Sequence, residues 1–193
     1  MSCPAATGHP GDNQMKKSLV FYLFLLSSVL PAFASSSGVN PDSLKFAAFR
    51  TALNSVSGWT EQQGKYSYFV TKALYDIIDG GAEEYLRAGL IDGMVAAFES
   101  AGNKNAELYI EDFGVQRHAQ AMMKKKRKTA AEPKSLPGSG DKNTFYDEVI
   151  GGCIVYFTSG RFYFEMVLTG YEKQDTALQD ARLFISAMTG KKK

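Results

Sequence analysis

Four carboxylates and a tyrosine lie close together in the least generic segment of the chain. Asp76, Asp79, Glu83 and Glu84 follow one another at spacings of three, four and one residues, and Tyr85 comes next. On a continuous helix, Asp76, Asp79 and Glu83 share one face. Such a face suits a hard cation or an acid–base pair, but a calcium site needs about six to eight oxygen ligands, usually from a loop richer in Asp and Asn. A solvated acidic face is the better interpretation.

Two glycines interrupt the helical pattern immediately after Asp79. Gly80 and Gly81 permit a tight turn, and the N–H groups that open the following helix favour an anion. The Lys and Ser or Thr of a phosphate-binding loop are missing, however. We therefore interpret Asp79 as the N-cap of a second half-helix and the glycines as a hinge. As a binding site, the segment offers Asp79, Gly80, Gly81, Glu83 and Tyr85, and it contains no residue with an assigned catalytic role.

A second candidate is a basic run made of Lys124, Lys125, Lys126, Arg127 and Lys128. The run lies near the C-terminus of a predicted helix, where cations complement the helix dipole. It could instead contact anionic lipid headgroups at a membrane surface, which is the lesser hypothesis beside a solvated helix end. No nucleic-acid partner is expected, because such a binder carries its positive charge on a folded face interleaved with aromatic residues.

Nitrogen and sulfur ligands are too few for metal chemistry. Beyond the N-terminal segment the chain has one histidine, His118, and one cysteine, Cys153. A zinc site of the usual kinds needs more than this pair, so we expect neither a metal nor a cofactor. Cys153 begins a predicted strand without a nucleophile-elbow pattern, and we interpret it as a small buried hydrophobe rather than a nucleophile.

The N-terminal segment is typical of a secretory signal peptide. Lys16 and Lys17 precede an apolar run over 19–30, and an Ala-Phe-Ala pattern ends at Ala34. We expect cleavage near Ala34 and an exported protein, periplasmic or extracellular. An uncleaved N-terminal anchor is the alternative. Met15 stands where such a peptide would start, so residues 1–34 are treated as an upstream extension plus signal peptide.

In the rest of the chain, the residue pattern predicts both helices and strands, and several strands follow one another directly. A short helix begins after Pro41 with Leu44, Ala47, Ala48 and Phe49 inward, and Thr71 caps the helix that leads into the glycine pair. Strands are expected at 91–99 and 107–111, followed by a helix at 116–128. The segments 153–157 and 162–168 flank a turn at 158–161 in which Gly160 supplies a positive φ, and they predict a hairpin. A last helix, capped by Asp175 and ended by Gly190, presents a nearly unbroken apolar stripe.

The predicted strands follow one another in sequence instead of alternating singly with helices, and this order favours an α+β fold. We predict a mainly antiparallel sheet of about five to six strands with helices packed on one face. The single domain covers 41–190 and includes an exposed loop at 129–143. A flexible leader at 35–40 precedes it, and a basic tail at 191–193 follows.

The segment around the glycine pair also carries a resemblance to known proteins. The residues that carry it are Tyr75, Ile78, Asp79, Gly80, Gly81, Ala82, Tyr85, Leu86 and Gly89, with a continuation over 108–113. In these positions the chain resembles a family of exported bacterial proteins known only as a domain of unknown function. Asp79 departs from that family, which has Asn there, and the Lys-rich run is not typical of it. The resemblance implies export and a compact α+β domain, and it brings no known activity.

Three functional hypotheses follow. The leading one is an exported domain of the bacterial envelope that binds a small ligand or a protein partner without catalysis. A hydrolase or lyase working with Asp79, Glu83 and Tyr85 is the first alternative. Peripheral attachment to a membrane surface through the basic run is the second.

Overall fold

The computed structural model describes residues 44–77, 81–137 and 143–190, all within one compact unit, Ala32–Lys193. The predicted signal segment, the 35–40 leader, Asp79, Gly80 and the basic tail lie outside the described residues, as does the side chain of Asp76. Across the described ranges, none of the helices has the length and apolar character needed to cross a membrane.

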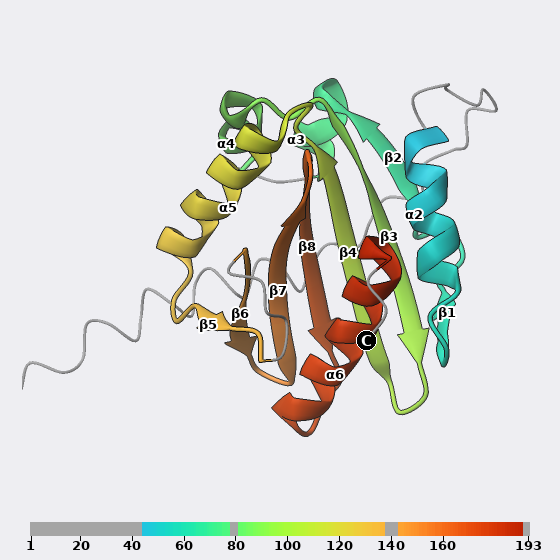
Figure 1. Ribbon diagram of the computed structural model, residues 1–193. Helices are drawn as coiled ribbons and strands as arrows, with labels where there is room; N and C mark the ends of the chain where they lie inside the picture. The colour runs from blue at the N-terminus through green and yellow to red at the C-terminus, as the bar shows by residue number, and fades with distance from the viewer. Residues whose placement is uncertain (1–43, 78–80, 138–142, 191–193) are drawn as a thin grey trace, which may run out of the picture. The chain divides into compact units, whose positions relative to one another are not determined.

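An antiparallel sheet of eight strands forms the centre of the described chain (Figure 1). The strands are β1 (Trp59–Glu61), β2 (Ser67–Val70), β3 (Asp92–Ser100), β4 (Lys104–Asp112), β5 (Lys134–Ser135), β6 (Thr144–Val149), β7 (Gly152–Ser159) and β8 (Phe162–Thr169). Their order is β1-β3-β4-β8-β7-β6-β5, with β2 also paired to β3. The predicted antiparallel α+β class is confirmed. The predicted strand number is too low, because β1, β2 and β5 have only two to four residues and show no period.

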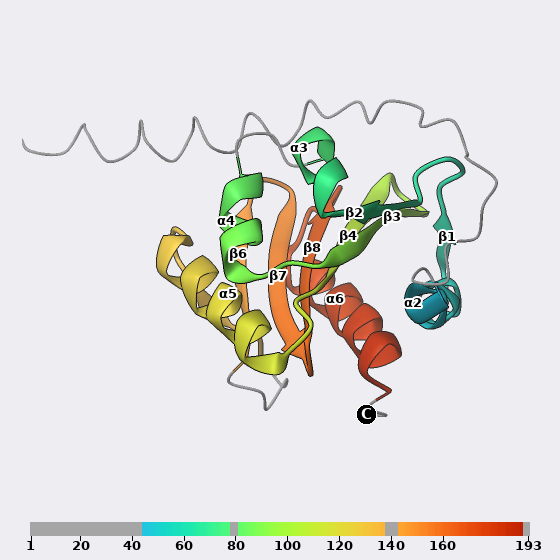
Figure 2. The same ribbon diagram turned by 90° about the horizontal axis from the view of Figure 1, so that it is seen from above.

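Helices cover both faces of this sheet. They are α2 (Leu44–Asn54), the 3₁₀ turn η2 (Thr71–Ala73), α3 (Leu74–Ile77), α4 (Ala82–Ala88), α5 (Gln116–Thr129) and α6 (Gln174–Thr189). Figure 2 shows α6 and α2 on one side of the strands and α4 on the other, beside α5. The expectation of helices on one face is therefore corrected. A second layer of helices is needed because large side chains of the strands, such as Phe145 and Tyr163, point away from α6 and are also buried.

The larger core lies between the sheet and the pair α2 and α6. Phe157 and Phe164 stack there with ring centroids 4.3 Å apart, and Trp59 meets Phe184 of α6 edge-on at 5.1 Å. The predicted stripe of α6 is buried as expected, and Gly190 ends the helix in the left-handed conformation. Asp175 is not its cap, because the helix already begins at Gln174.

The inward face of α2 differs from the predicted one. Phe46 and Leu53 are buried, whereas Leu44, Ala47 and Ala48 are exposed. The rotation follows from side-chain size, since burying Phe46 and Leu53 removes more apolar surface from water than burying alanines.

The segment predicted as an exposed loop, 129–143, contains the short strand β5. This strand pairs with β6, and Leu136 next to it is buried, whereas 131–133 and Pro137 are exposed. The carboxylate of Asp147 accepts hydrogen bonds from the backbone N–H groups of Ala131 and Glu132, both at 3.0 Å. These bonds fix the path by which the chain leaves α5.

Candidate functional site

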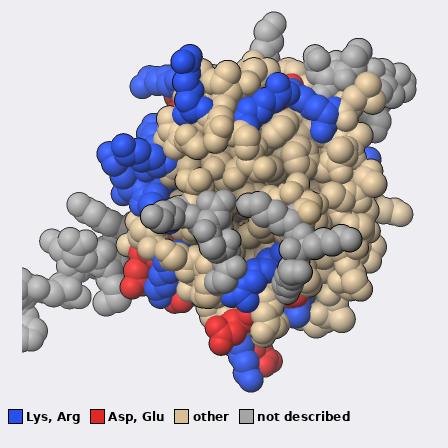
Figure 3. Space-filling model, viewed as in Figure 1, with Lys and Arg blue, Asp and Glu red and all other residues tan. Residues whose placement is uncertain are grey.

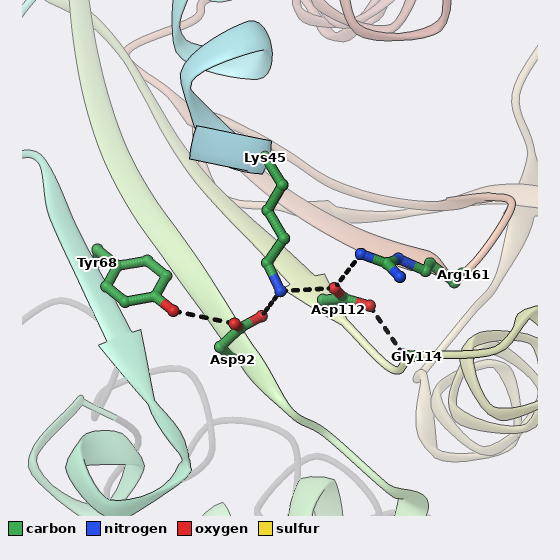
Figure 4. A network of polar contacts seen from close by, with 6 residues as sticks. All are labelled: Lys45, Tyr68, Asp92, Asp112, Gly114 and Arg161. Atoms are coloured by element: carbon green, nitrogen blue, oxygen red, sulfur yellow. Dashed lines mark hydrogen bonds and ion pairs between the residues drawn. The ribbon is translucent and has the colours of Figure 1, made fainter. Parts of the chain in front are cut away.

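The first candidate site is a buried ion network at one end of the sheet, drawn in Figure 4. Asp92 opens β3 and Asp112 closes β4, and the two are directly opposite in the register. Both side chains point toward α2, the direction also taken by Met94 and Ile110 of the larger core. Antiparallel pairing therefore brings two carboxylates together that are far apart in sequence.

Cations from two other elements neutralise this carboxylate pair. Lys45 of α2 lies with its Nζ 2.6 Å from Asp92 and 2.7 Å from Asp112. Arg161, in the turn between β7 and β8, lies 2.9 Å from Asp112. The hydroxyl of Tyr68 donates to Asp92 at 2.9 Å, and the N–H of Gly114 donates to Asp112 at 2.8 Å.

The network is electrically balanced within itself. Burial lowers the pKa of Lys45, but its contacts with Asp112 and Asp92 outweigh that effect and leave the pKa above its ordinary value. Two cations thus face two carboxylates, and hydrogen bonds occupy further carboxylate oxygens. This arrangement joins α2, β2, β3, β4 and the β7–β8 turn, and it is suited to holding them together.

The second candidate is an acid–tyrosine cluster on the opposite face, made of Tyr85, Glu111, Lys126, Tyr163 and Glu165. Glu111 of β4 is opposite Tyr163 of β8, and Glu165 lies two residues further along β8, opposite Tyr109, so the two carboxylates are diagonal neighbours on one face. The Tyr163 hydroxyl donates to Glu165 at 3.3 Å. Lys126 of α5 lies 3.7 Å from Glu165 and 4.9 Å from the ring centre of Tyr85.

Glu111 is the more deeply buried carboxylate of this cluster. Among the described residues its Oε2 has no hydrogen-bond partner. Burial raises the pKa of Glu111 well above its ordinary value, the charge of Glu165 adds to this, and Lys126 opposes it. Burial likewise raises the pKa of Tyr85 and of Tyr163 well above that of a free phenol. The site therefore favours the neutral form of all three groups.

The structure separates the members of the predicted binding segment. Gly81 stands at the N-cap of α4 and contributes no side chain. Tyr85 is buried in the acid–tyrosine cluster, whereas Glu83 is exposed, accepts a hydrogen bond from the Tyr75 hydroxyl and pairs with Arg87 at 3.6 Å. Glu83 and Tyr85 therefore do not share a site.

The basic run is also divided. Lys126 turns inward to Glu165, Lys125 pairs with Glu84 at 3.3 Å, and the guanidinium of Arg127 lies 5.0 Å from the ring centre of Phe145. Lys124 and Lys128 are exposed on the outer side of α5. Within the run, Lys126 is thus the partly buried residue, and its neighbours are exposed.

The one cysteine and the one histidine of the described residues, Cys153 and His118, are separated as well. Cys153 is fully buried in the larger core, as predicted, and burial raises its pKa to about 12. His118 lies on α5, against the other face of the sheet, next to Gly89. The two side chains have no common site. Within the described ranges, no three His, Cys, Asp or Glu side chains gather as a metal site.

Two surface hollows lie away from both clusters. One of about 590 Å³ is lined by Ala47, Arg50, Thr51, Asn54, Ser55 and Glu61. Another of about 390 Å³ is lined by Gly58, Thr60, Glu99, Ser100, Ala101, Asn103, Lys104 and Asn105. In the first, Arg50 is held by Glu61 in a two-point ion pair, with Nη2 2.6 Å and Nε 2.9 Å from the carboxylate. Neither hollow reaches the buried carboxylates.

Sequence analysis missed Lys45, Asp92, Glu111, Asp112 and Glu165. The available signal was an acid inside an apolar strand, as with Glu165 between Phe164 and Met166. Such an acid either faces solvent or is paired with another group. Glu111 is buried because α4 and α5 cover the face of the sheet opposite α6, and the sequence does not show this.

Comparison with protein-family models finds no match, and comparison with curated proteins finds none either. A solved structure, the extracellular domain of PknH from Mycobacterium tuberculosis, matches with a TM-score of 0.46 and 10% identity over 73% of this chain and 91% of that one. At this level of similarity the match assigns no function to the chain.

Proposed function

We propose that this protein is an exported domain of the bacterial envelope that binds its partner through its surface and does not catalyse a reaction. The observation that supports this most directly is the position of Glu111. A general acid or base has to reach the reacting group directly or through one water. Glu111 is 1% exposed, and neither hollow includes it.

The remaining charged groups support the same proposal. Asp92 and Asp112 are occupied by Lys45 and Arg161, so their charge is already neutralised inside the fold. Export is supported by the basic residues, apolar run and Ala-Phe-Ala pattern before Ser35.

One observation favours an enzyme as the second candidate. A buried carboxyl with a raised pKa beside two tyrosines is a common feature of general acids. Glu111, with Tyr85 and Tyr163, would then replace the predicted trio of Asp79, Glu83 and Tyr85. Substrate could reach it only if α4 or α5 moved away from the sheet.

Export is tested by producing the full chain with a C-terminal tag in a bacterium and separating cytoplasm from envelope. We expect a product outside the cytoplasm whose mass corresponds to a start near Ser35. A Leu25→Arg variant, which interrupts the apolar run, serves as the control and should stay inside at full mass. Wild-type protein that also stays inside would overturn the proposal.

Catalysis is tested separately on the exported product with ester, glycoside and phosphoester substrates. We expect no turnover above that of the Glu111→Gln variant. An activity that Glu111→Gln abolishes, while its thermal unfolding stays unchanged, would replace the binding function with the enzyme.

A further inference from the structure

Exposed apolar side chains gather at one end of the sheet. Among the described residues, the large exposed ones are Leu44, Val70, Tyr75, Ile91, Val115, Ile150 and Leu183. The first five belong to the end where β2 and β4 finish and β3 begins, which is the upper end in Figure 1. We call Leu44, Val70, Ile91 and Val115 the aliphatic rim. Their exposed fractions are 65%, 40%, 50% and 44%.

Each rim residue is tied to the ion network by the backbone. Val70 is opposite Asp92 in the register, and Leu44 directly precedes Lys45. The N–H of Ile91 donates to the carbonyl of Asp112 at 2.8 Å. Val115 follows Gly114, and the Ile91 side chain lies so close to Gly114 that a Cβ there would be 2.7 Å from its Cδ1. The rim therefore surrounds a rigid, cross-linked centre.

At this end of the sheet the positively charged side chains are more exposed than the carboxylates that they contact. The Arg161 and Lys45 side chains are 45% and 24% exposed, whereas Asp112 and Asp92 are 1% and 5% exposed. Figure 3 agrees, since basic side chains are prominent along the upper margin and most visible acidic ones lie lower. Exposed aliphatic groups with cations between them match the boundary of a lipid bilayer, where acyl chains meet phosphate groups.

The composition and size of the rim fit a bilayer better than a protein partner. Four partly exposed aliphatic side chains offer at most a few hundred Å², whereas a stable protein interface needs about 800 Å² from each partner. Centres of protein interfaces are also enriched in aromatic residues and Met, whereas the rim is aliphatic. The exposed aromatic side chain at this end, Tyr75, has its hydroxyl hydrogen-bonded to Glu83. A lipid surface requires no shape complementarity and accepts short aliphatic groups.

From these observations we propose that the aliphatic rim docks on the surface of an anionic lipid bilayer, with Arg161 and Lys45 at the level of the phosphate groups. The proposal rests on the proposed export and names the partner of the exported domain. It assigns lipid contact to the rim and not to Lys124 and Lys128 on α5.

The test uses the full chain with single fluorescent labels on introduced cysteines. In a Cys3→Ser background, an environment-sensitive probe is attached at Ile91→Cys or Val115→Cys, and at Ile150→Cys or Leu183→Cys as matched controls. Cys153 stays unlabelled because it is buried, with a pKa of about 12. The protein is added to vesicles of phosphatidylcholine and phosphatidylglycerol with brominated acyl chains.

We expect the emission of both rim probes to shift to the blue and to be quenched by the brominated chains, while both control probes stay unchanged. If the protein binds the vesicles but the emission of the rim probes stays that of a probe in water, the proposal is overturned. Quenching of probes at Lys124→Cys and Lys128→Cys instead would assign the contact to α5. A blue shift without lipid quenching would show that a protein surface covers the rim. Each of these results leaves the export test above unaffected, so the two failures can be told apart.

Discussion

Asp92 and Asp112 lie directly opposite each other on β3 and β4, and one ammonium group, that of Lys45, contacts both. Like charges in opposite positions of a sheet destabilise it, and here the pair is buried. The sheet end therefore depends on a cation supplied by α2.

The first prediction concerns that cation. Lys45→Met should lower the free energy of unfolding by about 2–3 kcal/mol, somewhat less than the loss of a fully buried partner, because Lys45 is partly exposed. Thermal unfolding should show a melting temperature lower by roughly 5–10 °C. Adding Asp92→Asn to Lys45→Met should recover part of the loss. A Lys45→Met protein with wild-type stability would contradict the bridging role.

The second prediction concerns pH and Glu111. Folding raises the pKa of Glu111 above its unfolded value of about 4.3, so the stability it contributes is present at or below that pH and is lost as pH rises toward the folded pKa. Glu111→Gln cannot ionise and should unfold with a weaker dependence on pH between pH 4 and 8, as measured by urea denaturation. Above pH 7 it should be at least as stable as wild type. Parallel pH profiles for the two proteins would count against a protonated Glu111.

The third prediction compares two lysines of the same helix. Lys126 contacts Glu165 and the ring of Tyr85, whereas Lys128 is exposed. Lys126→Met should therefore cost about 1–2 kcal/mol because it leaves Glu165 without its cation. Lys128→Met removes the same charge and should stay within about 0.5 kcal/mol of wild type. Equal effects in chemical denaturation would mean that Lys126 is no anchor.

The fourth prediction concerns the approach of β2 to β3. The ring of Phe69 packs directly on Gly93, and a Cβ there would also lie 2.9 Å from the carbonyl oxygen of Ile110. Gly93→Ala should cost about 1–3 kcal/mol through overpacking. In a double-mutant cycle, Phe69→Leu should reduce the cost of Gly93→Ala by at least about 0.5 kcal/mol. Strict additivity would show that the ring does not limit this site.

Elements with a long apolar pattern could be predicted from sequence. The hairpin of β7 and β8 consists of two strands rich in aliphatic and aromatic residues around a glycine turn, and the stripe of α6 repeats over four turns. Both are therefore predicted close to where they lie. The 3-residue β1 and the 2-residue β5 carry no period, and they are strands only because β3 and β6 pair with them.

The ion network could not be predicted because it depends on pairing rather than on pattern. Lys45 and Asp112 are 67 residues apart in sequence. Their contact requires the register of β3 with β4 and the placement of α2 over the larger core. The segment around Gly80 and Gly81 is distinctive in composition, yet the carboxyl with the raised pKa, Glu111, belongs to β4, where it resembles an ordinary strand residue.

Pairing between β4 and β8 has a consequence for how the chain folds. On one side of this pair lie β1 to β4, with the 21 residues 71–91 between β2 and β3, and on the other side lie β5 to β8, which are linked by shorter connections. Both clusters span the junction, with Asp112 to Arg161 on one face and Glu111 to Tyr163 on the other. Local hairpins form early, and long-range pairs are delayed by the entropy of loop closure. Until β4 meets β8, Asp112 has no guanidinium and Glu111 keeps its water. Lys45 can already contact Asp92 and Asp112 within the first half. The contact of Arg161 with Asp112 and the burial of Glu111 require the two halves to join, and we expect neither half to stay folded alone.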